Sequence, residues 1–507
     1  MECRSCRDRP RVSWLTDRKN KWHFRVTTPA VHPPAPPPAA MPHPGLLRAA
    51  QRVAAAPPER PGARRSTAQR SRRMGEGRAI RGAGGQAREG RFWKAEGAFR
   101  STGLQEKPII LDTILCLVVL LAVIGLTSVA HAAVGYNFTR LVDHVDDNFN
   151  LRSFTCASIN ESGDVAFKGT RSAPDGLSLW DVIARVNRAG VITTIAEDPA
   201  RTQFQFSSNV VSINDSGQTS FTAFLSNNDI AIFRADGTSM TTIASTAGRF
   251  SSFGFDTSLN NAGEVAFTAQ LDNGEQGLFS GTGTGGPVTT HYTSARPVLV
   301  DGVMTNLAGG NFGRPSINNT GGEIAFRDRV NGPVPVEGIF AGRRGVFRTL
   351  GPTDHFYGDA NNNDLGIGAF ETSFNNNGQF VTAIATSNAG VLSIVADTLN
   401  GYAGFSVSVP ATAPAINNRG QVAFRGFLPD FTTDGVFTGP NPKQDAIITS
   451  KEKLDGAQII SSSFSVCSEA LNNLGEVVFI VDLVDPTRIE GFRSAIYLAS
   501  PKKPLAP

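Results

Sequence analysis

Residues that commonly carry catalysis or bind metals are scarce after residue 132 of this 507-residue chain. Only three histidines occur there, His144, His291 and His355, and they lie too far apart for a metal-ligand spacing. The sequence also lacks a Gly-x-Ser-x-Gly nucleophile motif and a phosphate-binding loop. We expect these histidines to lie on the surface, and we assign no catalytic residue, no cofactor-binding residue and no metal ligand.

Tryptophan and tyrosine are also few, which argues against an aromatic sugar-binding face. Trp180 is the one tryptophan in this part of the chain, and the whole chain has five tyrosines. Phenylalanine, with 33 residues, is abundant, and we expect it to fill the core.

Positive charge is concentrated at the start of the chain and is low in the rest. Residues 1–108 contain 23 Lys and Arg against 8 Asp and Glu, which leaves 25 against 36 for the remainder. The first segment is rich in Arg and Pro and has no periodic apolar pattern, so we expect it to be disordered. Three interpretations of this segment are open: a basic tail that binds nucleic acid or acidic membrane, a cytoplasmic flank, or a stretch upstream of the true start codon. We favour the third. The acidic remainder argues against a nucleic-acid partner.

One long apolar run separates this segment from the rest. Residues 109–132 include the apolar stretch 109–130 and end in Ala130-His131-Ala132, which is typical of signal-peptide cleavage between Ala132 and Ala133. If it is not cut, the run is nearly long enough to span a bilayer, and it is then the only contact we expect with a membrane. In either case residues 133–507 are expected to be exported, to the extracellular space, the cell surface or the periplasm.

A pattern Asn-x-x-Gly-x-x-Ala-Phe recurs seven times in residues 133–507, at spacings of about 50 residues. The fifth copy lacks Phe at the last position. The copies comprise Asn160, Gly163 and Phe167; Asn214, Gly217 and Phe221; Asn260, Gly263 and Phe267; Asn319, Gly322 and Phe326; Asn375 and Gly378; Asn417, Gly420 and Phe424; and Asn472, Gly475 and Phe479.

Each copy is typical of a β-turn that joins two antiparallel strands. Asn opens a four-residue turn, and Gly accepts the left-handed conformation that closes it. The flanking residues alternate as in a strand, for example over 264–269. Downstream apolar segments supply further strands, so one repeat is expected to form a four-stranded propeller blade. We therefore predict an all-β fold, a seven-bladed β-propeller over 133–507, with a solenoid as the alternative.

The two ends of the repeat array are complementary. The last repeat ends after a third strand at 494–498, and a strand-like segment at 138–143 precedes the first repeat. We predict that this N-terminal strand joins the last blade and closes the ring. The fifth repeat shows no clear third strand, so an incomplete fifth blade is expected.

Two cysteines, Cys156 and Cys467, remain after the apolar run, just before the first and last copies. In a closed ring these blades are neighbours, and a disulfide there would hold the closure in an oxidising compartment. Two small buried thiols are the alternative.

Two acidic segments have oxygen-bearing side chains near calcium-loop spacing. In 359–364, Asp364 stands where the turn glycine of such a loop belongs, and Phe370 stands where its bidentate glutamate belongs. The segment 143–147 fits less well. We interpret both as polar turns, with calcium binding as the alternative, and we expect no other cofactor.

The seven repeat copies, over about residues 135–499, resemble the bacterial "choice-of-anchor" NxxGxxAF tandem-repeat family. The resemblance implies an exported surface or envelope protein of unknown function, and it supplies no catalytic residues. Members often carry a C-terminal anchoring tail of the PEP-CTERM type. The segment 498–507 has neither a Pro-Glu-Pro motif nor a terminal apolar helix, so we do not expect anchoring by this end.

Two functions fit these observations. The first is a non-catalytic exported propeller that binds or scaffolds an unknown protein or glycan ligand at the envelope. The second is a secreted carbohydrate-active hydrolase or lyase, which needs paired carboxylates that converge at the channel mouth. We favour the first because the sequence shows repeats and an export signal but no catalytic constellation.

Overall fold

The structure is a computed structural model. It describes residues 135–144, 151–173, 178–206, 208, 210–283, 286–309, 313–352, 355–405 and 413–503. The predicted basic tail, the apolar run with its cleavage site, and residues 145–147 lie outside the described residues. Within the described ranges, no helix has the length and apolar character needed to cross a membrane.

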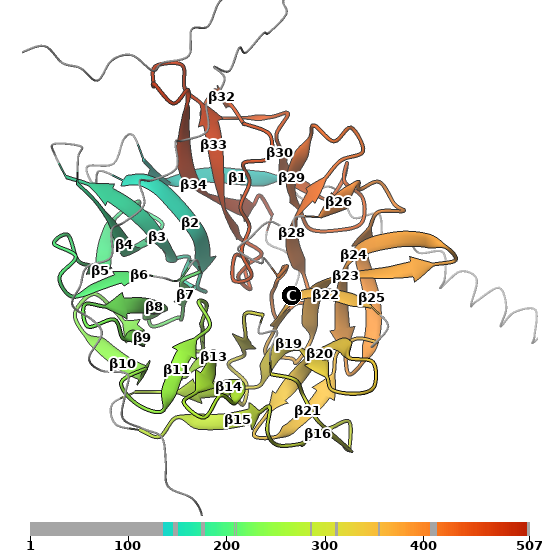
Figure 1. The fold of residues 1–507 in the computed structure, drawn as a ribbon. Coiled ribbons are helices and arrows are strands. Elements are labelled where there is room, and N and C mark those ends of the chain that lie inside the picture. The colour runs from blue at the N-terminus through green and yellow to red at the C-terminus, as the bar shows by residue number, and fades with distance from the viewer. Residues whose placement is uncertain are drawn as a thin grey trace, which may run out of the picture. The chain divides into compact units, whose positions relative to one another are not determined.

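Alternating apolar residues fold the described part of the chain into β-strands. The strands group into seven sheets, which follow one another in chain order around a common centre (Figure 1). One further two-stranded ribbon, β31 (Lys453–Leu454) with β32 (Ala457–Gln458), precedes the last sheet. The prediction of an all-β, seven-bladed propeller is confirmed.

The strands of each blade are as follows. The first blade contains β2 (Leu151–Ile159), β3 (Val165–Ser172), β4 (Leu179–Val186) and β5 (Ile192–Glu197). The second contains β6 (Phe204–Phe206), β7 (Ser212–Ile213), β8 (Thr219–Leu225), β9 (Ile230–Ala235) and β10 (Met240–Ser245). The third contains β11 (Phe250–Phe253), β12 (Ser258–Leu259), β13 (Val265–Leu271), β14 (Gln276–Gly281) and β15 (Thr289–Thr293).

The fourth blade contains β16 (Val298–Val300), β17 (Val303–Thr305), β18 (Ser316–Ile317), β19 (Ile324–Val330), β20 (Val336–Arg343) and β21 (Val346–Thr349). The fifth contains β22 (Phe356–Asn362), β23 (Gly368–Asn376), β24 (Gln379–Asn388) and β25 (Val391–Asp397). The sixth contains β26 (Gly404–Phe405), β27 (Ala415–Ile416), β28 (Val422–Phe427), β29 (Asp434–Phe437) and β30 (Ala446–Thr449). The seventh contains β1 (Tyr136–Asp143), β33 (Val477–Val484) and β34 (Phe492–Pro501).

The seventh sheet combines strands from opposite ends of the described chain. β1 pairs with β34 in antiparallel register, with Phe138 opposite Ala499 and Thr139 opposite Leu498. β34 in turn pairs with β33, so the sheet has the order β1-β34-β33.

The fifth blade corrects two expectations. It is complete, because β22, β23, β24 and β25 form a four-stranded sheet. Its turn is not at Asn375 but at Asn363, where Asn363, Gly366, Ala369 and Phe370 make an intact copy of the motif. Asn375 and Gly378 belong to the exposed hairpin between β23 and β24, whose register pairs Asn376 with Gln379. With the fifth copy placed at Asn375, one strand after the true turn, no segment was left that matched the third strand of this blade.

The motif phenylalanines fill the core of the blades. Phe221, for example, is fully buried and meets the ring of Phe206 edge to face, with ring centroids 5.2 Å apart. Such aromatic pairs add stability beyond the burial of their area. The buried set is Phe167, Phe221, Phe267, Phe326, Phe370, Phe424 and Phe479.

The expectation of surface histidines is wrong for His144 and His291, which are both buried. His291 contacts the hydroxyl of Ser280 through Nε2, and its Nδ1 accepts the N–H of Arg344. Burial lowers the pKa of His291 to about 3, and the charges of Arg343 and Arg344 act in the same direction. This imidazole is therefore a neutral hydrogen-bonding part of the core.

Candidate functional site

Each repeat turn is organised by its asparagine side chain. In the first turn, Oδ1 of Asn160 accepts the N–H of Asp164 at 2.9 Å, and the backbone of Asn160 pairs with both Gly163 and Asp164. An asparagine side chain that accepts backbone N–H groups in this way imitates a peptide and stabilises the turn. Gly163 has a φ of 83°, a conformation that side chains with a Cβ rarely adopt.

The seven turn asparagines also bond to one another in a closed ring. The Nδ2 of each one donates to the backbone carbonyl of the asparagine in the next blade, and the seventh, Asn472, donates to Asn160 at 3.3 Å. All seven side chains are buried, so these bonds exclude water and link every blade to its neighbours. We call this set the asparagine ring: Asn160, Asn214, Asn260, Asn318, Asn363, Asn417 and Asn472.

A second ring lies one residue further along each turn. The backbone N–H of each residue donates to the side-chain oxygen of its counterpart in the next blade, as from Glu161 to Asp215 at 2.9 Å. The seventh, Asn473, donates to the carboxylate of Glu161 and closes the ring. We call this set the mouth ring: Glu161, Asp215, Asn261, Asn319, Asp364, Asn418 and Asn473.

The two rings surround a cavity of about 160 Å³. Residues of the mouth ring are exposed or half-buried, whereas the asparagine ring is buried, so the cavity opens at the mouth ring. Six apolar residues that precede the turn asparagines line its wall, and we call them the apolar collar: Ile159, Ile213, Leu259, Ile317, Ile416 and Leu471. The fifth blade places Asn362 at this level instead.

Polar residues form the inner end of the cavity. Ser316, Asn361, Ser468 and Glu469 line it there, and the amide of Asn361 donates to the carbonyl of Ser468. Oε1 of Glu469 accepts bonds from Ser258 at 3.1 Å and from the guanidinium of Arg314. Oε2 of Glu469 is buried and has no hydrogen-bond partner in the described part of the chain.

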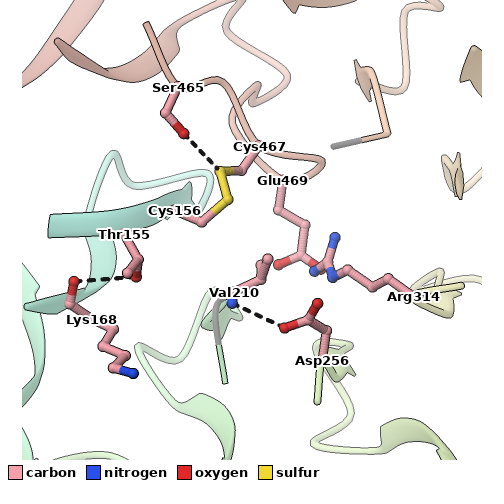
Figure 2. Close-up of a disulfide and its surroundings, with 9 residues drawn as sticks. All are labelled: Thr155, Cys156, Lys168, Val210, Asp256, Arg314, Ser465, Cys467 and Glu469. Carbon is pink, nitrogen blue, oxygen red and sulfur yellow. Dashed lines mark hydrogen bonds and ion pairs between the residues drawn. A yellow bond between two sulfur atoms is a disulfide. The ribbon is translucent and has the colours of Figure 1, made fainter. Parts of the chain in front are cut away.

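The disulfide lies close to Glu469, which lines this inner end (Figure 2). Cys156 of β2 and Cys467 are bonded, with Cα atoms 5.7 Å apart, and both are buried with Val210. Figure 2 shows the ion pair of Arg314 with Glu469 across the same region. A covalent bond and an ion pair therefore join segments that are far apart in the sequence close to the cavity.

Arginine side chains of one blade donate hydrogen bonds to turn carbonyls of the next blade. Arg185 of the first blade donates to the carbonyl of Gly217 in the second at 3.0 Å, and Arg234 of the second donates to Gly263 in the third. A Cβ at Gly217 or Gly263 would displace the guanidinium from this position and so disturb the bond between the blades. The bridge from Arg188 to Glu476, at 2.5 Å, links the first blade to the seventh.

The structure moves two of the predicted motif residues. The turn asparagine of the fourth blade is Asn318, whose Oδ1 accepts the N–H of Glu323, and the predicted Asn319 lies in the mouth ring. This turn is one residue longer than the others and has Gly321 and Gly322 in succession, both with positive φ. Asn375, predicted for the fifth turn, lies on an exposed hairpin away from the rings.

The candidate calcium segment 359–364 is an inner strand followed by a repeat turn. Its oxygen-bearing side chains serve different partners: Asn361 accepts a bond from Ser316, Asn363 belongs to the asparagine ring, and Asp364 belongs to the mouth ring. Among the described residues, no group of three His, Cys, Asp or Glu side chains is arranged to hold a metal ion.

Three carboxylates converge at the mouth ring: Glu161, Asp215 and Asp364. Burial raises the pKa of Glu161 above its ordinary value, the bond from Asn473 opposes this, and the charges of Asp215 and Asp364 add to it. The site therefore repels a further negative charge and favours a positive one.

Sequence reasoning did not find the mouth ring, although a signal was present. The residue after the turn asparagine is Glu, Asp or Asn in all seven copies and never apolar. Because this position lies one residue beyond a buried side chain, its polarity alone looks like ordinary turn chemistry. Its role appears only when the copies are aligned on the correct turns.

A separate acidic group lies between the fifth and sixth blades. Glu371 is buried, and it lines a small cavity with Arg425, whose guanidinium is bound to Asp434 at 2.8 Å. Burial alone raises the pKa of Glu371 to about 7. The neutral carboxyl is thus the form that suits this interface.

We expect Glu371→Gln to stabilise the protein at pH 8 by about 1–3 kcal/mol and to have little effect at pH 4. The folded-state pKa of Glu371 is raised, so stability is lost as the pH rises from the ordinary value of 4.5 through about 7. Urea unfolding at both pH values measures the difference, with Asp272→Asn as the control for an exposed carboxylate. Equal stabilisation at pH 4 and pH 8 would contradict the assignment.

Comparison with known proteins places the chain in a family. A family model described as "Family of unknown function (DUF7453)" matches residues 142–349 and again 348–505. The chain belongs to the DUF7453 family. The two matches together cover nearly the whole propeller of this DUF7453 chain, and a comparison with curated proteins found no match.

Solved structures give only distant similarities. The β-propeller domain of the Trilobed protease from Pyrococcus furiosus is 10% identical, with a TM-score of 0.42 over 68% of this chain and 93% of that domain. A puromycin-hydrolyzing peptidase of Mycobacterium tuberculosis is 12% identical, with a TM-score of 0.41 over 70% of this chain and 54% of the peptidase. A neuraminidase-like protein of subtype N11 from the virus A/flat-faced bat/Peru/033/2010 (H18N11) is 10% identical, with a TM-score of 0.30 over 74% of this chain and 98% of that protein. At such low scores and identities, these similarities say nothing about the activity of the DUF7453 chain.

Proposed function

We propose that the protein is an exported, non-catalytic propeller that binds a ligand at the envelope through the mouth ring and the cavity beneath it. The observation that carries this proposal is the mouth ring itself. Its seven side chains are held in place by bonds between blades, so they present a preorganised polar surface around one opening. A ligand that binds there need not order the site first.

Export is supported by the chain's cysteines and by its apolar segment. A disulfide persists in oxidising compartments outside the cytoplasm, and Cys156 and Cys467 are bonded. The run 109–130, with cleavage between Ala132 and Ala133, is the proposed export signal. The repeat copies also resemble those of the NxxGxxAF surface proteins, and the proposal takes the exported location from that resemblance.

The proposal also assigns β1 the role of closing strand. Its pairing with β34 supports this role, since it joins the two ends of the described chain in one blade. The links from Asn472 to Asn160 and from Arg188 to Glu476 connect the same blade to the first one. The seam between these blades is therefore held by several independent contacts.

A panel of polysaccharides, glycans and envelope proteins, incubated with the purified full chain, tests the binding function. Bound and cleaved material are measured together. We expect binding without cleavage, and binding should weaken when Asp215→Asn and Asp364→Asn are combined. No binding to any member by folded protein would reject the proposal.

The alternative is a carbohydrate-active hydrolase or lyase, and one observation favours it. Glu161 and Asp215 lie in adjacent blades at the mouth, and the pKa of Glu161 is raised by burial, as a general acid requires. Both carboxylates, however, accept backbone N–H groups of the mouth ring. Cleavage of a panel member that is abolished by Glu161→Gln would establish this alternative.

A further inference from the structure

The cavity has three chemical zones along its length. At its opening the mouth ring contributes three carboxylates, and no Lys or Arg is among the described residues that line the cavity. Beneath it the apolar collar contributes six aliphatic side chains. At the inner end Glu469, which is paired with Arg314 through Oε1, presents a buried Oε2 that has no hydrogen-bond partner among the described residues.

The size of the cavity limits what can enter. An engineered cavity of about 150 Å³ in another protein holds benzene, and this one has about 160 Å³. An occupant of this size has roughly half a dozen heavy atoms. Because six aliphatic side chains surround this part of the cavity, an aliphatic group suits it chemically.

The charged residues at the opening limit the possible occupant further. A cation at the opening would relieve the repulsion among Glu161, Asp215 and Asp364, whereas an anion would increase it. A bare metal ion suits the site less well, because calcium needs six to eight oxygen ligands and the ring oxygens already accept backbone N–H groups. An ammonium group donates hydrogen bonds to the remaining carboxylate lone pairs without displacing these bonds.

We propose that the cavity binds an ammonium group carried on a short methylene chain, either as a free alkyl diamine or as a lysine side chain of a partner. The methylene chain lies in the apolar collar, as the stems of lysine side chains do against apolar surfaces. One ammonium faces Oε2 of Glu469, and the charge or peptide group at the other end of the chain lies in the mouth ring. The proposal rests on the binding function proposed above and names its ligand chemistry.

Titration calorimetry of the full chain with small probes tests this. We expect 1,5-diaminopentane to bind at one site per chain, about tenfold more tightly than n-pentylamine, and to weaken as salt is raised. The uncharged 1,5-pentanediol should not bind. A lysine-containing peptide compared with its norleucine analogue shows whether a protein side chain can be the source.

The mouth ring offers variants that should fold normally. Four of its seven positions are already asparagine, so Asp215→Asn and Asp364→Asn keep the oxygen that accepts the neighbouring backbone N–H. They remove the charge and one acceptor oxygen, which binds the side-chain amide of Asn261 or Asn418 in the unchanged chain. Each should weaken diamine binding about 5- to 10-fold. Asp272→Asn, which removes an exposed charge from a hairpin of the third blade, should leave it unchanged.

The outcomes are distinct. Binding of the diol as tight as that of the diamine, equal losses from Asp272→Asn and Asp215→Asn, or calcium binding without amine binding would each overturn the proposal. Folded protein that retains a panel ligand but binds neither the diamine nor the lysine peptide would reject the ammonium chemistry and leave the binding function in place. Diamine binding by folded protein that binds no panel member would support the ammonium chemistry of the cavity and reject the envelope-binding function proposed above.

Discussion

Replacing Asn363 with alanine should destabilise the fold by about 2–4 kcal/mol, whereas the same change at Asn375 should cost less than about 1 kcal/mol. The Asn363 side chain donates to the carbonyl of Asn417 at 2.8 Å and accepts the N–H groups of Leu365 and Ile367. Without this side chain, the N–H groups of Leu365 and Ile367 and the carbonyl of Asn417 lose these hydrogen bonds close to the buried asparagine ring. Asn375 is exposed on its hairpin.

The pair is a matched test because both asparagines precede a glycine at the same spacing. The Asn375 side chain accepts one bond, from the N–H of Gly378, and bonds to no other blade within the described residues. Urea unfolding of both variants and of the unchanged chain measures the difference in the free energy of unfolding. Equal losses would show that the asparagine ring contributes no more than an ordinary hairpin turn.

The repeat pattern was enough to predict the architecture because its physics is local. An asparagine that caps a turn, a glycine in a left-handed conformation and a phenylalanine in the core are each readable from a few neighbouring residues. Copies such as that at Asn260, Gly263 and Phe267 therefore predict strand, turn and strand wherever they occur. The number of blades then follows from the number of copies.

The two misplaced turn asparagines lie where neighbouring residues offer two possible positions for the repeat turn. The run Asn361-Asn362-Asn363 resembles a polar loop, whereas the segment from Asn375 to Gly378 resembles a repeat turn. Each segment is compatible with a tight turn when it is considered alone. The local pattern does distinguish them, because 363–370 matches the whole motif and the copy at Asn375 lacks Phe. The bond from Asn363 to Asn417, over 54 positions, shows which of the two turns belongs to the ring. A long-range bond is also what separates Asn318 from Asn319, where one extra turn residue shifts the ring by one position.

The candidate site was beyond sequence reasoning for a related reason. Glu161, Asp215 and Asp364 lie in the first, second and fifth blades, far apart in the sequence, and only the closed ring brings them to one opening. The members of the apolar collar each precede a turn asparagine and are buried, so their sequence pattern is that of ordinary core residues. In this ring they leave a cavity around the axis, and a strand pattern does not reveal that.

Removing the disulfide between Cys156 and Cys467 should lower the free energy of unfolding by about 4–5 kcal/mol. The two cysteines are separated by 311 positions, so the bond restricts nearly the whole propeller in the unfolded chain. In the folded state it joins the first blade to the seventh, beside the link from Asn472 to Asn160. Loss of the bond therefore raises the entropy of the unfolded chain and leaves the seam to non-covalent contacts.

Unfolding of the double variant Cys156→Ala and Cys467→Ala, with and without reducing agent, measures this loss. The unchanged chain should fall to the stability of the variant when reduced, the variant should not respond to reduction, and Cys116→Ala should behave as the unchanged chain does. If the seam is where the reduced propeller opens, Glu476→Gln, which removes the ion pair with Arg188, should cost more in the double variant than in the oxidised chain. Equal costs in both backgrounds would mean that the first and seventh blades separate only with global unfolding, and that the disulfide acts on the unfolded chain alone.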